Sequence, residues 1–187
     1  MKIRNIEDLL QIGLQYMYDA ELQLTEILPK MAQATCTPQL RQAFDHHLAE
    51  TREHIARIVE IFKKLGQHPE ARPNAILTQI THAAETLMLE IEECPIRDAA
   101  LIVAGNQIEH FEIASYGSLR TFAQLLGKEE IVDILDKTLH EEKQADTCLT
   151  EIAQQQVNLE ALHMSAAAGV EGPAATFAKE LYFSANA

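Results

Sequence analysis

Residues 101–126 read LIVAGNQIEHFEIASYGSLRTFAQLL, a run without proline in which one set of positions recurs every three or four residues. The set consists of Leu101, Gly105, Ile108, Glu112, Ser115, Leu119, Phe122 and Leu126. This spacing is typical of an α-helix that buries one face. The alternation is kept only through Glu112, so the pattern predicts a long buried helix with a carboxylate at a core position.

Two further expected helices carry a carboxylate in their apolar stripe. In residues 5–34 the spacing is complete only with Glu21. In residues 128–156 it includes Glu142, and Asp146 follows four residues later on the same face. A buried ionised carboxylate costs several kcal/mol even after relaxation. Three in-phase carboxylates on three helices therefore need a shared counter-charge, which divalent metal ions supply.

The remaining main helix, over residues 38–66, contributes histidine to this pattern. Its stripe consists of Phe44, His47, Thr51, His54, Ile58, Ile61 and Leu65. Glu50 lies at the edge of the stripe, four residues before His54 and three after His47. Carboxylates on three helices with a histidine on the fourth indicate a metal site inside a bundle.

Each of these residues also has a plainer interpretation. A single carboxylate on such a stripe is more often partly exposed, and His47 is more often a core histidine than a ligand. Glu53 and Glu141 are expected on solvated faces. Tyr18 and Tyr116 either lie near the site or are ordinary packed residues of their helices. The joint pattern, and no single residue, carries the prediction of a metal site.

Proline and glycine set the limits of the expected helices. Helices are predicted over residues 5–34, 38–66, 74–93, 95–126 and 128–156. Asn5 and Thr37 are expected N-caps, and Gly127 an expected C-cap. The main helices would each span roughly 45 Å, and the connection over residues 67–95 is long enough to return the chain along them. We therefore predict an all-α, ferritin-like antiparallel four-helix bundle with a long crossover connection that contains an extra helix.

A chain of 187 residues is long enough for one well-packed domain. We assign residues 1–158 to the bundle. Residues 159–187 are expected to form a C-terminal tail, either a short helix or a mobile segment, because Gly172 and Pro173 break any helix there.

The composition excludes several classes of function. The formal net charge of -13 argues against binding nucleic acid or anionic lipid through bulk electrostatics. No apolar run reaches the roughly 18 residues of a membrane span, and residues 1–8 do not resemble a secretory signal. The three cysteines, Cys36, Cys94 and Cys148, are odd in number and form no CxxC pair. We therefore expect three reduced thiols in a cytoplasmic protein.

Several segments together resemble the YciE/YciF family of ferritin-like proteins. The matching segments are EHFEIASYG at residues 109–117, RDAALI at 97–102, AELQL at 20–24, ETREH at 50–54 and TLHEEK at 138–143. The resemblance covers about residues 3–156 and leaves the tail uncovered. It implies a di-iron-type bundle that forms a cytoplasmic homodimer linked to stress responses. In general plan such a bundle is similar to rubrerythrin and manganese catalase.

The resemblance also implies a set of metal ligands. The set is Glu21, Glu50, His54, Glu109, Glu112, Glu142 and Asp146. It departs from the usual Glu-x-x-His pairs, because the pairs on the second and fourth main helices are spaced by four residues and Asp146 replaces the second histidine. Such a carboxylate-rich set would hold two iron ions, or two manganese ions, per chain.

Three functions are compatible with these residues. The first is a di-iron oxidoreductase, either a ferroxidase or a peroxide-reducing enzyme, with dioxygen or peroxide as its oxidant. The second is a non-enzymatic metal-binding or structural stress-response dimer whose site is incomplete. The third is a regulator that hands iron to a partner. Metal-dependent turnover would separate the first function from the other two.

Overall fold

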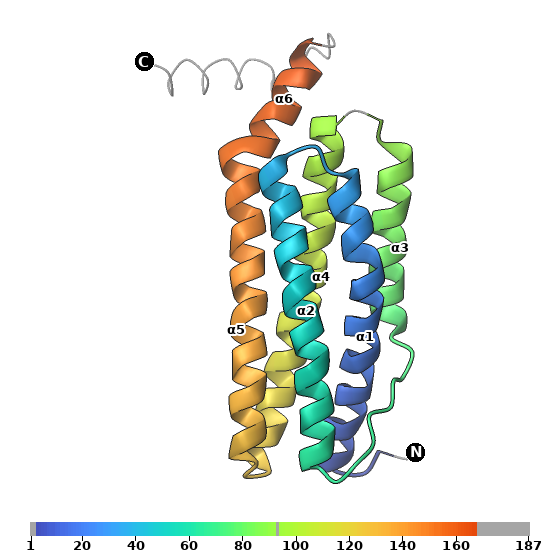
Figure 1. Cartoon of the computed structure of the whole chain (residues 1–187), viewed down its shortest axis with the longest axis vertical. Coiled ribbons are helices and arrows are strands. Elements are labelled where there is room, and N and C mark those ends of the chain that lie inside the picture. Colours follow the sequence, from blue (N-terminus) through green and yellow to red (C-terminus); the bar gives the residue numbers. More distant parts are fainter. Residues whose placement is uncertain (1–2, 93, 168–187) are drawn as a thin grey trace.

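The computed structural model describes residues 3–92 and 94–167, and over these residues the chain forms helices joined by short connections (Figure 1). In chain order the elements are α1 (Ile6–Ala34), α2 (Pro38–Lys64), α3 (Ala75–Glu90), α4 (Cys94–Leu125), α5 (Glu129–Ile152), a π-helical turn η1 (Ala153–Val157) and α6 (Asn158–Ala167). The prediction of an all-α fold is confirmed. The rest of the predicted tail, residues 168–187, lies outside the described residues.

Four long helices, α1, α2, α4 and α5, form the bundle, and α3 packs on its outside against α1 and α4. Figure 1 shows that α1 and α2 are antiparallel, as are α4 and α5. The connection after α2 and then α3 carry the chain back along the bundle, so α2 and α4 run in the same direction. The predicted crossover with an extra helix is therefore confirmed.

The helix ends follow local sequence signals. The Asn5 side chain accepts a hydrogen bond from the backbone N–H of Asp8 at 2.8 Å, and Asn74 caps α3 in the same way. Gly127 has a φ of 65°, a conformation that favours glycine, and it follows α4 closely as the predicted C-cap.

Apolar side chains from all four bundle helices fill the interior above and below its middle. They include Leu10, Leu14, Met31, Leu40, Phe44, Ile58, Phe62, Leu101, Leu119, Leu135 and Leu149. Gly105 allows α4 to approach α5 closely, because an added Cβ there would lie only 2.7 Å from Leu149 Cδ1. Within the described part of the chain, no helix combines the length and the apolar character that crossing a bilayer requires.

A disulfide joins the α1–α2 connection to the first residue of α4. The pair is Cys36 and Cys94, whose Cα atoms are 6.1 Å apart, while Cys148 is free. The prediction of three reduced thiols is therefore wrong. The two cysteines are 58 residues apart in sequence, and only the crossover brings them together, so their spacing alone gave no sign of a pair.

Beside this disulfide, Arg97 and Asp98 form hydrogen bonds with free backbone groups at the ends of three helices, α1, α2 and α3. The buried Asp98 accepts hydrogen bonds from two backbone N–H groups at the start of α2, one of them that of Thr37 at 2.8 Å. Arg97 donates to the carbonyls of Ala34 at 2.9 Å and Ile91 at 3.2 Å. Thr37 occupies the predicted N-cap position, but its own side chain makes no capping bond. We call Cys36, Cys94, Arg97 and Asp98 the clasp.

Candidate metal centre

Six ionisable side chains meet in the interior of the bundle, and each is at most 5% exposed. They are Glu21 of α1, His47 and His54 of α2, Glu109 and Glu112 of α4, and Glu142 of α5. We call these six residues the centre. Each lies in phase with the buried apolar residues of its own helix, so helix formation itself turns it inward.

The centre divides into two groups, and within each group the possible ligand atoms lie within 4.8 Å of one another. The first group is His47, Glu109, Glu112 and Glu142, and the second is Glu21, His54 and Glu142. Glu142 belongs to both. Its Oε2 lies 3.8 Å from His47 Nε2, and its Oε1 lies 3.0 Å from His54 Nδ1. The two oxygens of one carboxylate therefore face the two histidines.

The other carboxylates complete each group around its histidine. His47 Nε2 lies 3.4 Å from Glu109 Oε1 and 3.9 Å from Glu112 Oε2. His54 Nδ1 lies 3.4 Å from Glu21 Oε1. Most of these separations are longer than a hydrogen bond, which leaves space between the atoms that a cation could fill.

Most polar atoms of the centre lack a hydrogen-bond partner, although they are buried. Both oxygens of Glu112 and Glu142, both ring nitrogens of His47, and single atoms of Glu21, His54 and Glu109 accept or donate no hydrogen bond. Buried polar groups in proteins are normally hydrogen-bonded, and each exception calls for an explanation such as an ion. The residues present therefore fit a metal: these buried histidine and glutamate groups could hold a metal ion.

In the metal-free protein, bound protons offset part of the negative charge of the buried carboxylates. Burial raises the pKa of Glu109 and Glu112, and the nearby carboxylate of Glu142 raises each further. Burial lowers the pKa of both histidines, but the surrounding carboxylates outweigh it and raise the pKa of His47 to about 9 and of His54 to about 11. Both histidines are thus protonated at neutral pH in the metal-free centre.

A neighbouring residue of α5 fixes the orientation of His54. Its Nε2 lies 2.9 Å from Glu141 Oε2, so this nitrogen donates to Glu141 and Nδ1 is left facing the centre. Glu141 is itself held by Arg57, which also donates to Thr138 at 3.1 Å. Burial tends to raise the pKa of Glu141, but Arg57 and His54 lower it below the usual range. The prediction that Glu141 lies on a solvated face is therefore wrong.

Tyr116 is the aromatic member of the site. It is fully buried, and its hydroxyl donates a hydrogen bond to Glu21 Oε1. Its ring centroid lies 6.3 Å from that of His54. Tyr18, the other tyrosine considered, packs against Phe62 instead.

Two of the predicted ligands lie outside the centre. Glu50 lies behind His47, with its Oε2 3.6 Å from Nδ1 of that ring. Asp146 accepts a hydrogen bond from Asn106 at 2.8 Å and pairs with His110 at 3.3 Å, on the side of α5 that faces α4. The structure thus brings together five of the seven predicted ligands and adds His47, which the sequence had placed on the right stripe.

Comparison of the sequence with known proteins identifies a family and a close relative. Residues 5–162 match the model of a family described as a domain of unknown function, DUF892. The chain is 39% identical to the protein YciF of Escherichia coli over 162 residues, which cover 86% of this chain and 98% of that protein.

Solved structures show the same similarity. The crystal structure of the E. coli stress protein YciF has a TM-score of 0.80 at 38% identity and covers 83% of this chain and 99% of that one. YcfI of Rhodopseudomonas palustris has a TM-score of 0.78 at 39% identity, covering 80% and 95%. A protein from Xanthomonas campestris, at 20% identity and a TM-score of 0.67 over 86% and 99%, shares the fold alone.

Proposed function

The chain belongs to the DUF892 family and is a relative of E. coli YciF, and we propose that its centre binds two iron or manganese ions and uses them to reduce dioxygen or hydrogen peroxide. The observation that carries the proposal is Glu142, whose two oxygens face two separate groups of buried ligands. A carboxylate shared in this way suits a pair of ions held close together.

The charge of the centre supports two divalent cations. Its four carboxylates together carry the negative charge that two such cations neutralise, and both histidines can then be neutral ligands. The donors are oxygens with two imidazole nitrogens and no thiolate, a set that suits iron or manganese and disfavours sites built for soft metals. A single divalent ion would leave part of the buried negative charge uncompensated.

The surrounding residues hold these donors in place. Glu141 keeps the proton of His54 on Nε2, so that Nδ1 is free to bind a cation. Tyr116 fixes one oxygen of Glu21 by a hydrogen bond and leaves the other without a partner. When bound, two redox-active ions supply two electrons to one oxidant molecule. Packed apolar residues above and below the centre limit the access of water along the axis of the bundle.

A structural role is the second candidate, and two observations favour it. YcfI of R. palustris is provisionally described as a structural protein, and E. coli YciF is described as a stress protein. The clasp also ties three helix ends of this chain together by a disulfide and buried hydrogen bonds. In this alternative the centre binds metal to stabilise the bundle and turns over no substrate.

The cytoplasmic homodimer implied by the resemblance remains a proposal as well. The disulfide Cys36–Cys94 bears on it, because cellular reductants keep most cytosolic thiols reduced. Trapping thiols in intact cells with an alkylating reagent would establish whether this pair is oxidised where the protein resides.

Anaerobic titration of the metal-free protein with Fe(II), followed by dioxygen or peroxide, tests the proposed function. We expect two Fe(II) per chain and rapid oxidation, both lost in Glu21→Ala. Asp146→Asn is the matched control, because this carboxylate lies outside the centre and its contact with Asn106 can persist. Stoichiometric binding without accelerated oxidation would favour the structural role, and absence of stoichiometric binding would refute both metal-based functions.

A further inference from the structure

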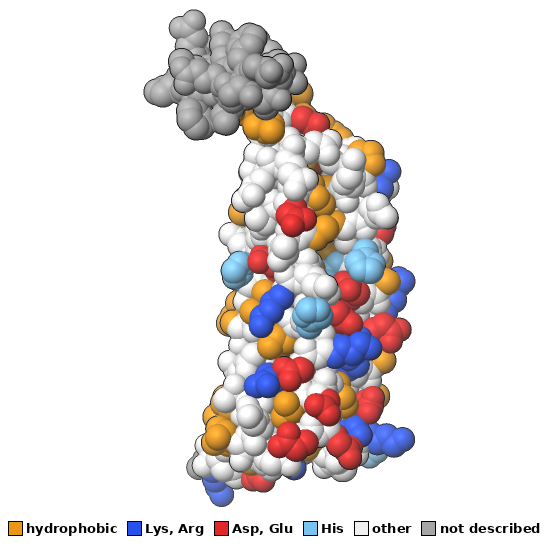
Figure 2. All heavy atoms as spheres, turned by 90° about the vertical axis from the view of Figure 1, so that its left-hand side faces the viewer, with side chains coloured by type: hydrophobic (Ala, Val, Ile, Leu, Met, Phe, Trp, Pro, Cys, Tyr) orange, Lys and Arg blue, Asp and Glu red, His pale blue; other side chains and the backbone are white. Residues whose placement is uncertain are grey.

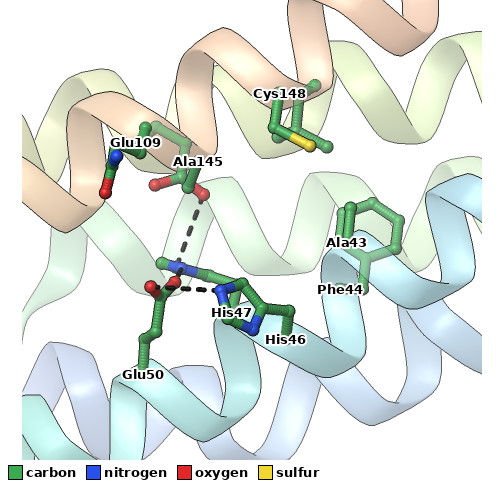
Figure 3. A pocket seen from close by; sticks show the side chains of 10 residues that line it. Ala43, Phe44, His46, His47, Glu50, Glu109, Ala145 and Cys148 are labelled. Carbon is green, nitrogen blue, oxygen red and sulfur yellow. Dashed lines mark ion pairs between the residues drawn. The ribbon is translucent and has the colours of Figure 1, made fainter.

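A pocket between α2 and α5 reaches the centre from outside. It has a volume of about 280 Å³, and its wall includes His47 and Glu109, which both belong to the centre. Figure 3 shows His47 of α2 paired with Glu109 of α4, and Cys148 of α5 among the side chains that line the same pocket. Of the described residues that line the pocket, none is lysine or arginine.

Three ionisable side chains, His46, Glu50 and His47, lie one after another along this wall from the surface towards the centre. Side-chain exposure falls from 74% at His46 to 20% at Glu50 and 5% at His47. Glu50 contacts both histidines, with Oε1 3.3 Å from His46 Nε2 and Oε2 3.6 Å from His47 Nδ1. One carboxylate therefore joins an exposed imidazole to a buried one.

The ring of His47 is contacted from both directions. Its Nδ1 faces Glu50 in the pocket, while its Nε2 faces Glu109 of the centre at 3.4 Å. Both ring nitrogens are buried and make no hydrogen bond. An ion that leaves the oxygens of Glu50 thus finds the next carboxylate on the opposite side of the same ring.

We propose that Glu50 and His46 form an outer site for divalent cations, from which ions pass His47 into the centre. This inference rests on the proposed function and extends it by assigning the route of loading. The pocket favours a cation over an anion, because a carboxylate lies at its mouth and its described lining residues include no lysine or arginine. Figure 2 shows histidines at mid-height on the face over α5, with both acidic and basic side chains around and below them.

Rates of Co²⁺ uptake test the outer site without any measure of turnover. Co²⁺ is mixed with metal-free protein in a stopped-flow spectrometer, and its ligand-field absorbance reports the rate and the final stoichiometry. We expect Glu50→Gln to slow uptake about tenfold and to leave the final stoichiometry at the value of the unaltered protein. The matched control is Glu53→Gln, which removes the same charge from an exposed position on α2 outside the pocket.

Cys148 allows a second test on folded, unmutated protein. It is the free cysteine among the described residues and lines the same pocket. Alkylation with a bulky maleimide under non-reducing conditions should obstruct the pocket and slow Co²⁺ uptake, whereas Cys148→Ser treated with the same reagent should load at the unmodified rate.

The outcomes distinguish failure of the proposed outer site from failure of the proposed metal centre. Slowed uptake in both Glu50→Gln and the alkylated protein, with unchanged stoichiometry, supports the outer site. Unchanged rates with full stoichiometry in both would overturn the outer site and leave the proposed function standing. If the unaltered protein takes up no Co²⁺ and no Fe(II) in stoichiometric amounts, the centre is not a metal site and the route is refuted with it.

Discussion

The clasp and the centre each contain a buried carboxylate of α4, but only the carboxylate of the clasp has hydrogen-bond partners. Asp98 accepts hydrogen bonds from the backbone N–H groups of Cys36 and Thr37. Glu112, on the same helix, has no hydrogen-bond partner for either oxygen. A satisfied buried carboxylate stabilises the fold, whereas an unsatisfied one is costly until a cation joins it. The comparison indicates that the clasp stabilises the fold, whereas the centre is suited to holding a cation.

The largest expected effect on stability comes from the clasp disulfide. Reducing Cys36–Cys94 opens a loop closed over 58 residues, which should lower the free energy of unfolding by about 4 kcal/mol in the chain-entropy model. Denaturant titration with and without reductant measures the loss. The double variant Cys36→Ser, Cys94→Ser should be equally unstable and indifferent to reductant, and Fe(II) stoichiometry should be unchanged in both. A loss of metal binding on reduction would contradict the separation of the two regions.

Removal of the satisfied carboxylate should have the next largest effect. Asp98→Ala leaves two backbone N–H groups without an acceptor, and we expect a loss of about 3 kcal/mol. Asp98→Asn, which keeps one acceptor oxygen, should lose less. Denaturant titrations of both variants give the values. An unchanged free energy of unfolding in Asp98→Ala would mean that water replaces the carboxylate as the acceptor.

The pH dependence of metal binding follows from the protons of the centre. The pKa values of about 9 for His47 and about 11 for His54 mean that both rings are protonated at neutral pH without metal. A pair of cations must displace both of these protons and any held by Glu109 and Glu112. The overall affinity for the pair should therefore rise by at least about a factor of 100 per pH unit, or about 2.7 kcal/mol. Calorimetry in buffers of different ionisation enthalpy counts the protons released. Release of none would show that the histidines are not ligands.

The smallest expected effect has the opposite sign from that of Asp98→Ala. Burial, together with the neighbouring carboxylates of Glu142 and Glu21, raises the pKa of Glu112 and so disfavours its ionised form in the metal-free protein. Glu112→Gln should stabilise the metal-free fold by only about 1 kcal/mol, and this gain should grow as pH rises and the native carboxylate is forced to ionise. Fe(II) should then stabilise the unaltered protein, by roughly 2.7 kcal/mol at one hundred times its dissociation constant, but not the variant.

Much of the fold and part of the centre could be predicted, because the spacing of residues along a helix determines which of them share a face. At 3.6 residues per turn, seven residues return to within about 20° of the same direction, whereas four residues miss it by about 40°. His47 and His54 are seven apart and share the interior. Asp146, four residues beyond Glu142, has turned away to Asn106 of α4. The same drift separates Glu50 from His54.

Other features could not be predicted, because they depend on which helices become neighbours. The link between Cys36 and Cys94 requires the crossover. The contact of His54 with Glu141 requires α2 to lie beside α5 in one particular rotation. A charged residue such as Glu141 has no apolar periodicity of its own, so spacing within a helix cannot distinguish it from a solvated one.

The position of Glu142 has a consequence for the newly made chain. Residue 142 is on the last helix of the bundle, and both ligand groups need it. The antiparallel pair α1–α2 can associate early in synthesis, since its contacts are local. Neither half-site is complete, however, until α5 has left the ribosome and docked. On the proposed function, a partly synthesised chain therefore cannot assemble the metal pair, and redox chemistry would begin only in finished molecules.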